Sequence, residues 1–226
     1  MSRRSLIRMC LLALLFCMQV VPFSSSSLRA QPEYPETISV LQKLYFDEIL
    51  ALHKYAVYAQ KVESENYPDI AKLFFALAAS ESIHARNFKQ LLSGLGVEVK
   101  EIQKPEIEVF TTRKNLEHAC NVELEEIDNR YPDFIKKVEQ ERHAEAILKI
   151  TYAWESEKQH RDLIQKIRSG TGFLFSFLVK QMKEPPSKYL VGQNCGSTLT
   201  ELPKKSCPIC GSSISSYSEI GTSNPQ

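Results

Sequence analysis

The chain has 226 residues, of which 43% are hydrophobic and 24% are charged, and its 28 basic side chains nearly balance its 27 acidic ones. Eight glycines are few for this length, which disfavours an all-β protein with glycine turns and favours helices. Residues 1–30 hold four arginines and no acid, so the remainder is slightly acidic, with 24 basic and 27 acidic groups. A body without basic runs lacks the electrostatic footprint of a nucleic-acid-binding protein.

The first thirty residues have the features of an export signal. Arginines precede the apolar run 9–21, and a serine cluster and Ala30 follow it, which is the order of a cleavable secretory signal. The run is shorter than the roughly 20 apolar residues of a membrane span, which disfavours an uncleaved anchor. Arg3 and Arg4 also resemble a twin-arginine signal. We therefore expect an exported, periplasmic protein with no stable membrane span after processing.

Residues 35–170 are expected to form a helical domain. Apolar residues three and four positions apart predict helices over residues 35–65 and 67–94. After a long loop, Thr112 could cap a third helix, and a fourth ends before Gly170. The apolar face of each helix is interrupted by at least one carboxylate.

The second and fourth helices share a polar motif within their apolar faces. A Glu-x-x-His pair occurs as Glu81 and His84 in one helix and as Glu157 and His160 in the other. The spacing of three residues places both side chains on one face of the helix. One such pair would be weak evidence, but the repetition of the pair indicates a shared function.

The first and third helices add carboxylates at matching depth. Glu48 precedes Glu81 by 33 residues, and Glu123 precedes Glu157 by 34 residues, so the two halves of the domain are similar to a repeat. Glu126 lies one turn beyond Glu123. The one extra residue in the second half is typical of a helical bulge beside a functional site.

Five carboxylates in an apolar bundle require a counter-charge. Each unpaired buried charge would cost several kcal/mol even after the protein relaxes. Two divalent or trivalent metal ions supply it, and a set of carboxylates and imidazoles favours iron or manganese over zinc. Single glutamates from two helices and Glu-x-x-His from two others are the pattern of dimetal four-helix bundles. The sequence therefore predicts an all-α, ferritin-like four-helix bundle around a two-metal site.

These residues resemble those of rubrerythrins, which are ferritin-like di-iron proteins with a C-terminal rubredoxin-like domain. The resemblance covers essentially the whole chain after the export signal. The extra glutamate on the third helix, here Glu126, distinguishes rubrerythrins from ferritins. The matching segments are Phe46-Asp47-Glu48, residues 80–85, residues 123–126 ahead of Tyr131-Pro132, and residues 157–160.

The resemblance implies a ligand set, an activity and partners. The implied activity is the reduction of hydrogen peroxide to water, in which Glu126 exchanges with His84 at the iron as its oxidation state changes. An external electron donor and a homodimer or higher homo-oligomer are also implied. Ferroxidase activity with oxygen, and iron binding or storage, are the alternatives. Tyr55 and Tyr131 correspond to tyrosines beside the site, although core packing would explain them equally well. The implied iron ligands are Glu48, Glu81, His84, Glu123, Glu126, Glu157 and His160.

The C-terminal segment departs from this family pattern. We expect a linker over residues 171–186, a degenerate rubredoxin-like domain over residues 187–218 and a tail over residues 219–226. Gly192 stands at the first of the four thiolate positions, and three cysteines remain, Cys195, Cys207 and Cys210. The alternatives are a working redox centre, one iron or zinc ion bound by three thiolates with water or a nearby side chain, and a metal-free or disulfide-bonded remnant.

Overall fold

The computed structural model describes residues 33–169, 186 and 188–221. The predicted export signal, nearly all of the predicted linker and the end of the predicted tail lie outside the described residues. A set of long helices comes first and a small antiparallel sheet follows. The helices are α1 (Pro35–Ser64), α2 (Pro68–Gly94), α3 (Thr112–Glu125), η1 (Glu126–Arg130), α4 (Tyr131–Glu141) and α5 (Ala144–Ser169). The sheet region contains β1 (Tyr189–Gly192), β2 (Thr198–Leu199), η2 (Ile214–Ser216) and β3 (Tyr217–Ile220).

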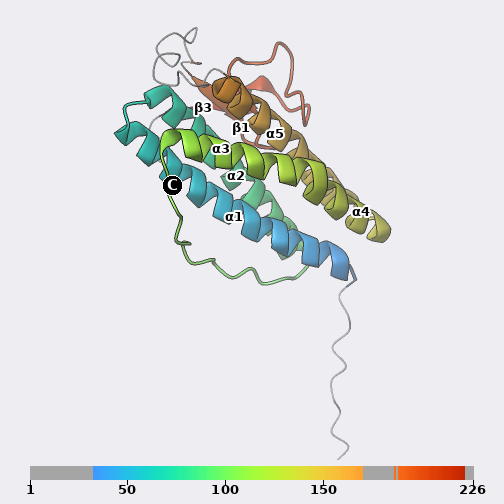
Figure 1. Ribbon diagram of the computed structural model, residues 1–226. Coiled ribbons are helices and arrows are strands. Elements are labelled where there is room, and N and C mark those ends of the chain that lie inside the picture. The colour runs from blue at the N-terminus through green and yellow to red at the C-terminus, as the bar shows by residue number, and fades with distance from the viewer. Residues whose placement is uncertain (1–32, 170–185, 187, 222–226) are drawn as a thin grey trace, which may run out of the picture. The chain divides into compact units, whose positions relative to one another are not determined.

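The helices form a bundle in which α3, η1 and α4 follow one another as a single rod beside α1, α2 and α5 (Figure 1). Helix α1 packs against α2, and both parts of the third rod pack against α5. Proline occupies the first turn of α1 and of α2, where its missing N–H costs no helical hydrogen bond. The predicted all-α four-helix bundle is confirmed. None of the helices within residues 33–169 combines the length and apolar character needed to cross a membrane.

The third rod contains the bulge that the repeat spacing predicted. The turn η1 is a π-helix that begins at Glu126, directly after α3. A π turn accommodates one extra residue, which matches the spacing of 34 in the second half against 33 in the first. The indole Nε1 of Trp154 donates a hydrogen bond of 3.0 Å to the carbonyl of Ile127 within this turn. The extra residue therefore lies beside the predicted metal site.

The start of α3 differs by one position from the prediction. Thr112 is the first helical residue and does not cap the helix; Thr111 precedes it, and its side chain makes no capping hydrogen bond. Instead, Glu65 accepts hydrogen bonds from the Thr112 backbone N–H (3.0 Å) and hydroxyl (2.7 Å). A carboxylate from the turn after α1 thus satisfies the helix terminus, a partner that no local pattern identifies.

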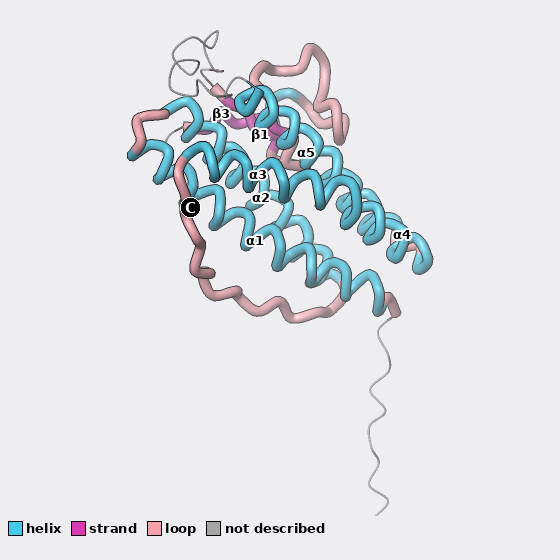
Figure 2. Tube along the Cα trace, viewed as in Figure 1, coloured by secondary structure: helices cyan, strands magenta, loops and turns pink. Residues whose placement is uncertain are grey.

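Apolar side chains form two clusters along the bundle. One contains Tyr55 and Phe74 and reaches α5 at Ile164. The other contains Leu41 and Phe88 and includes residues of α4 and the first half of α5. Along α1, α2, α5 and the rod formed by α3, η1 and α4, the predicted ligands lie between these two clusters. The loop between α2 and α3 runs beside α1 and packs several of its apolar side chains against both clusters (Figure 2).

The sheet is small and antiparallel, with the strand order β2-β1-β3. Tyr189 and Val191 of β1 are buried and belong to the same apolar cluster as Phe74 of α2. The sheet therefore shares a hydrophobic core with the bundle. We call residues 188–221 the ribbon.

Candidate metal centre

Six of the seven predicted iron ligands come together in two overlapping groups in the middle of the bundle. Within each group, one ligand atom per residue lies within 4.8 Å of the others. Glu81 and Glu157 belong to both groups, so each can bridge two metal ions. The first group is Glu48, Glu81, His84 and Glu157, and the second is Glu81, Glu123, Glu157 and His160.

Both histidines direct Nδ1 towards the carboxylates. Nδ1 of His84 lies 3.0 Å from an oxygen of Glu81 and 3.2 Å from one of Glu157. Nδ1 of His160 lies 2.9 Å from Glu157 and 3.4 Å from Glu81. All four side chains are at most 2% exposed. Nδ1 of each ring therefore faces the position where a bridged metal ion would lie.

The electrostatics of the site show that it lacks a positive charge. Burial raises the pKa of Glu48 to about 8, and burial with the charges of Glu157 and Glu81 raises the pKa of Glu123 well above its usual value. Burial lowers the pKa of His160, but the charge of Glu157 outweighs it and raises the pKa to about 9. Protons on Glu48, Glu123 and His160 therefore neutralise the buried charge that metal ions would otherwise balance.

The donor set fits a pair of iron ions. Oε2 of Glu123 is buried without a hydrogen-bond partner, and Oε1 of Glu157 has only the 3.2 Å contact with Nδ1 of His84, which lacks the geometry of a hydrogen bond, although a buried carboxylate oxygen normally has a partner. Carboxylate oxygens and imidazole nitrogens suit iron and manganese. Two metal ions would satisfy both oxygens and neutralise the buried acids.

Two buried tyrosines hold Glu48 and Glu123, the outer glutamates, each of which belongs to only one of the two groups. The hydroxyl of Tyr55 donates a hydrogen bond of 2.5 Å to Glu123, and that of Tyr131 donates one of 2.7 Å to Glu48. Partners of this kind fix the orientation of ligands. Both tyrosines therefore do more than fill the core.

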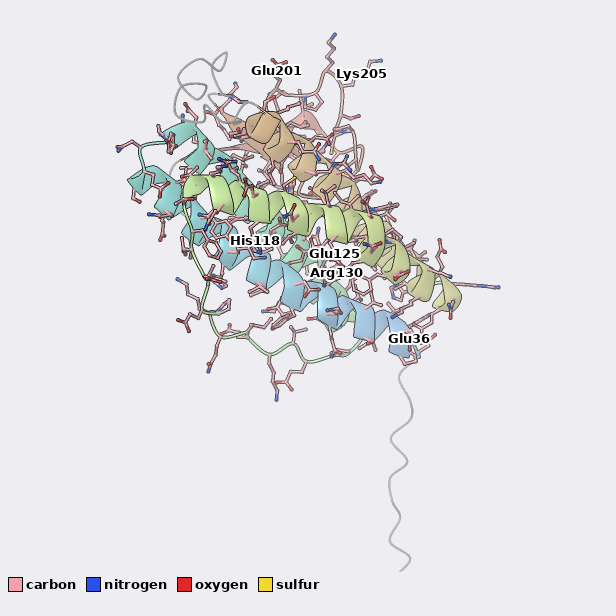
Figure 3. The ribbon with its side chains drawn as sticks, in the orientation of Figure 1. Glu36, His118, Glu125, Arg130, Glu201 and Lys205 are labelled. Carbon is pink, nitrogen blue, oxygen red and sulfur yellow. The ribbon has the colours of Figure 1, made fainter. Side chains whose placement is uncertain are left out.

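Glu126 lies apart from the two groups. Its side chain is 19% exposed and its carboxylate accepts a hydrogen bond of 2.9 Å from Arg130. Arg130 also pairs with Asp47 of α1 and lies 4.0 Å from Glu125 (Figure 3). Arg130 is not among the residues predicted for the site, although its spacing of four residues from Glu126 is typical of a helical ion pair.

A surface pocket of about 350 Å³ opens beside this ion pair. Its charged lining consists of Asp47, Lys54, Glu125, Glu126 and Arg130. A smaller pocket, also lined by Glu126 and Arg130, reaches Glu48 of the first group. The ion pair therefore lies between solvent and the buried carboxylates.

The ribbon contacts the other side of the histidine rings. Nε2 of His84 lies 3.2 Å from the carbonyl of Cys195, and Nε2 of His160 lies 3.3 Å from the hydroxyl of Thr198. The carbonyl of Gly196 accepts hydrogen bonds from Ser80 (2.7 Å) and Ser156 (2.9 Å). These contacts fix the ring nitrogens that face away from the metal positions.

Three ribbon cysteines form a second potential metal site. The sulfur atoms of Cys195, Cys207 and Cys210 lie within 4.8 Å of one another, and all three thiols are free. Sγ of Cys195 lies 3.5 Å from Sγ of Cys207, well beyond the roughly 2.05 Å of a disulfide bond. The geometry therefore suits a metal ion better than a disulfide.

Comparisons with known proteins place the chain in a family. The rubrerythrin family model matches residues 39–168. The chain is 30% identical over 176 residues to Rubrerythrin-2 of Clostridium acetobutylicum, with 77% of this chain and 91% of that protein covered. It is 30% identical over 128 residues to nigerythrin of Nitratidesulfovibrio vulgaris, with 56% and 62% covered.

Solved structures have the same fold. A mixed-valent nigerythrin structure matches with a TM-score of 0.69 at 24% identity, covering 81% of this chain and 86% of that one. A bacterioferritin of Desulfovibrio desulfuricans matches with a TM-score of 0.61 at 22% identity, covering 68% and 90%. These likenesses confirm the ferritin-like bundle. Together with the family match and the two carboxylate-histidine groups, they identify the chain as a di-iron protein of the rubrerythrin family.

Proposed function

We propose that this protein reduces hydrogen peroxide to water at its two-iron centre and so protects against oxidative stress. One observation carries the proposal: the two ligand groups share Glu81 and Glu157, so two ions would lie next to each other in one buried site. Peroxide takes up two electrons and two protons to become two water molecules, and two ferrous ions held by these residues would supply one electron each.

The chain's own residues would hold this pair. Glu81 and Glu157 would bridge the ions, while Glu48 with His84 and Glu123 with His160 would complete the two sides. Nδ1 would be the donor atom of each histidine. Tyr55 and Tyr131 would hold the outer glutamates through their hydroxyls.

We further propose that Glu126 and His84 exchange places when the iron is oxidised. In the described conformation, His84 faces the shared carboxylates and Arg130 holds Glu126 outside both groups. Oxidation adds positive charge, which a carboxylate neutralises and a neutral imidazole does not. An inward movement of Glu126 would therefore offset one of the two positive charges that oxidation of both ions adds.

The pocket at Arg130 supports a route for a small oxidant. It is open to solvent and charged, which suits a polar molecule of the size of peroxide. The electrons would come from an external donor, since Gly192 removes a thiolate from the ribbon. We also propose that the protein is exported to the periplasm and works as a homodimer or higher homo-oligomer. Mass spectrometry of the native N-terminus and the solution mass test these two points.

The reaction is tested on the purified mature protein. Its diferrous form is mixed without air with either peroxide or oxygen, and the oxidation of iron is followed with time. We expect faster oxidation by peroxide. Faster oxidation by oxygen would indicate a ferroxidase and contradict the proposal.

Glu126→Ala tests the exchange. We expect nearly unchanged iron binding, because six other ligands remain, but peroxide turnover slower by roughly tenfold or more. Glu117→Ala of α3 is the matched control, since the Glu117 side chain is 44% exposed, lies outside the pocket at Arg130 and belongs to neither ligand group. Equal turnover in both variants would exclude a role for Glu126.

A further inference from the structure

The missing thiolate of the ribbon leaves a space that another side chain occupies. Gly192 of β1 is paired directly with Tyr217 of β3. Side chains of directly opposed residues in an antiparallel pair lie on the same face of the sheet. A Cβ atom on Gly192 would lie only 3.3 Å from both Cε1 and Cζ of the Tyr217 ring. The hydroxyl-bearing end of Tyr217 therefore packs tightly against the point where a side chain of residue 192 would begin.

Hydrogen bonds hold the Tyr217 hydroxyl beside the cysteines. It donates a hydrogen bond of 2.9 Å to Oγ of Ser197, which itself donates to Gln159 of α5 (3.1 Å). The phenol oxygen also contacts the Cys207 thiol, whose S–H can donate to it while the phenol donates its own proton to Ser197. The phenol oxygen is thus within hydrogen-bonding reach of a thiol sulfur.

The three sulfur atoms already have the spacing of metal ligands. Zinc or iron at about 2.3 Å from each sulfur in a tetrahedral site would separate the sulfurs by about 3.8 Å. The observed separation of 3.5 Å between Cys195 and Cys207 is close to this value. Gly196 and Gly211, which follow Cys195 and Cys210, have positive φ angles of 78° and 71°, so each knuckle can turn tightly behind its cysteine.

We propose that the ribbon binds one iron or zinc ion through Cys195, Cys207, Cys210 and the phenol oxygen of Tyr217, which replaces the missing thiolate. The phenol releases its proton to solvent when it binds. A phenolate is a harder donor than a thiolate and favours the ferric state, so iron at this site would be harder to reduce than at a four-thiolate site. The ribbon would then be a weaker electron relay, independently of what the di-iron centre does.

The test compares the full-length mature protein with Tyr217→Phe, which removes only the hydroxyl. Tyr152→Phe is the matched control, because the charges of all three cysteines act on this second phenol. Each protein is loaded with ferrous iron, oxidised and analysed for metal per chain and for its visible and resonance Raman spectra. The two irons of the bundle contribute equally to all three samples and cancel in difference spectra.

We expect three metal ions per chain in the wild type and in Tyr152→Phe. With iron in the ribbon, both should show phenolate-to-iron absorption with enhanced tyrosine ring vibrations, and Tyr217→Phe should lose them. With zinc in the ribbon, a chelator should remove the third ion at least about tenfold faster from Tyr217→Phe. In Gly192→Cys combined with Tyr217→Phe, a four-thiolate iron spectrum should appear.

Two results would overturn the proposal. One is a third ion whose spectrum and release rate are the same in Tyr217→Phe as in the wild type, which would assign the fourth position to water. The other is a wild-type chain with two metal ions and an empty or oxidised ribbon. Neither result affects peroxide turnover at the bundle, which is measured separately.

Discussion

Single residues decide which groups can reach the iron positions. Glu81 and Glu157 lie in both ligand groups because each sits in the middle of its helix and faces the other. Glu126 is only three residues from Glu123, yet Arg130 draws its carboxylate to the surface side of the rod. The ion pair with Arg130 therefore keeps Glu126 outside the ligand groups, whereas Glu123, one turn earlier, faces the metal positions.

Arg130→Met should make the centre easier to oxidise. The variant removes the partner that holds Glu126 outside, and it removes a positive charge near the iron, so both effects favour the oxidised state. We expect a lower reduction potential and a severalfold faster oxidation of the diferrous form by peroxide. Redox titration and stopped-flow absorption measure these quantities.

Arg130→Lys is the control, because it keeps the charge but loses the planar fork that reaches Asp47 and Glu126 together. If the potential of Arg130→Met equals that of the wild type, Arg130 does not restrain Glu126.

At the scale of elements, the π turn η1 and the ribbon adjust the bundle to its site. The turn η1 takes up one extra residue, after which Tyr131 is again buried and bonded to Glu48. The ribbon places its first knuckle against α2 and α5, where the backbone of Cys195 and Gly196 meets polar side chains of both helices. This close approach depends on Gly196, because any side chain there would collide with His84 and Ser80.

Gly196→Ala should weaken the contact between the ribbon and the bundle. The new Cβ would lie 2.3 Å from Nε2 of His84 and 2.6 Å from Oγ of Ser80, and the φ angle of 78° is strained for alanine. We expect a loss of about 2–3 kcal/mol, from roughly 1 kcal/mol of backbone strain and the remainder from the clash. Thermal unfolding and hydrogen exchange in residues 189–199 measure the loss.

Gly211→Ala separates the two causes. Its φ angle is 71°, but no atom lies within 4 Å of the new Cβ, so only the backbone strain remains. Equal losses in the two alanine variants would show that the ribbon does not press on His84.

The whole molecule is built around buried acidic groups that two bound metal ions would neutralise. Apolar clusters lie on both sides of the buried acids, so water cannot solvate them. In the metal-free protein, bound protons must neutralise these acids, which agrees with the raised pKa values of Glu48 and His160. The stability of the metal-free protein should therefore depend on pH.

The metal-free protein should lose stability as the pH rises. Both groups bind protons more tightly when folded than when unfolded, so their contribution is present in acid and is lost as pH rises through the folded pKa values of about 8 and 9. We expect the melting temperature to fall steadily between about pH 5 and pH 9, by an amount that corresponds to a few kcal/mol.

Thermal unfolding of chelator-treated protein at several pH values tests this expectation. The iron-loaded protein is the control and should vary much less, because its ligands no longer exchange protons in this range. A metal-free protein that is most stable near pH 9 would contradict the expectation.

Local patterns were enough to predict much of the bundle. Helix periodicity placed Glu81 with His84 and Glu157 with His160, because residues three apart always share a helix face. The one-residue difference between the halves predicted the bulge that appears as η1. Arg130 could have been found from its spacing to Glu126. The role of the seven residues as ligands stays a prediction, as does the export signal.

Local sequence patterns are enough to place the helices, to name the candidate ligand side chains and to show the lack of a thiolate at Gly192, because these depend on neighbours a few residues apart. The tertiary structure was needed to find which glutamates are shared between the two groups, where Glu126 points and which side chain stands opposite Gly192. Those outcomes depend on packing between segments far apart in the chain, such as His84 and Cys195, which are 111 residues apart. Their contact arises when separate elements are buried together, so no local pattern contains it.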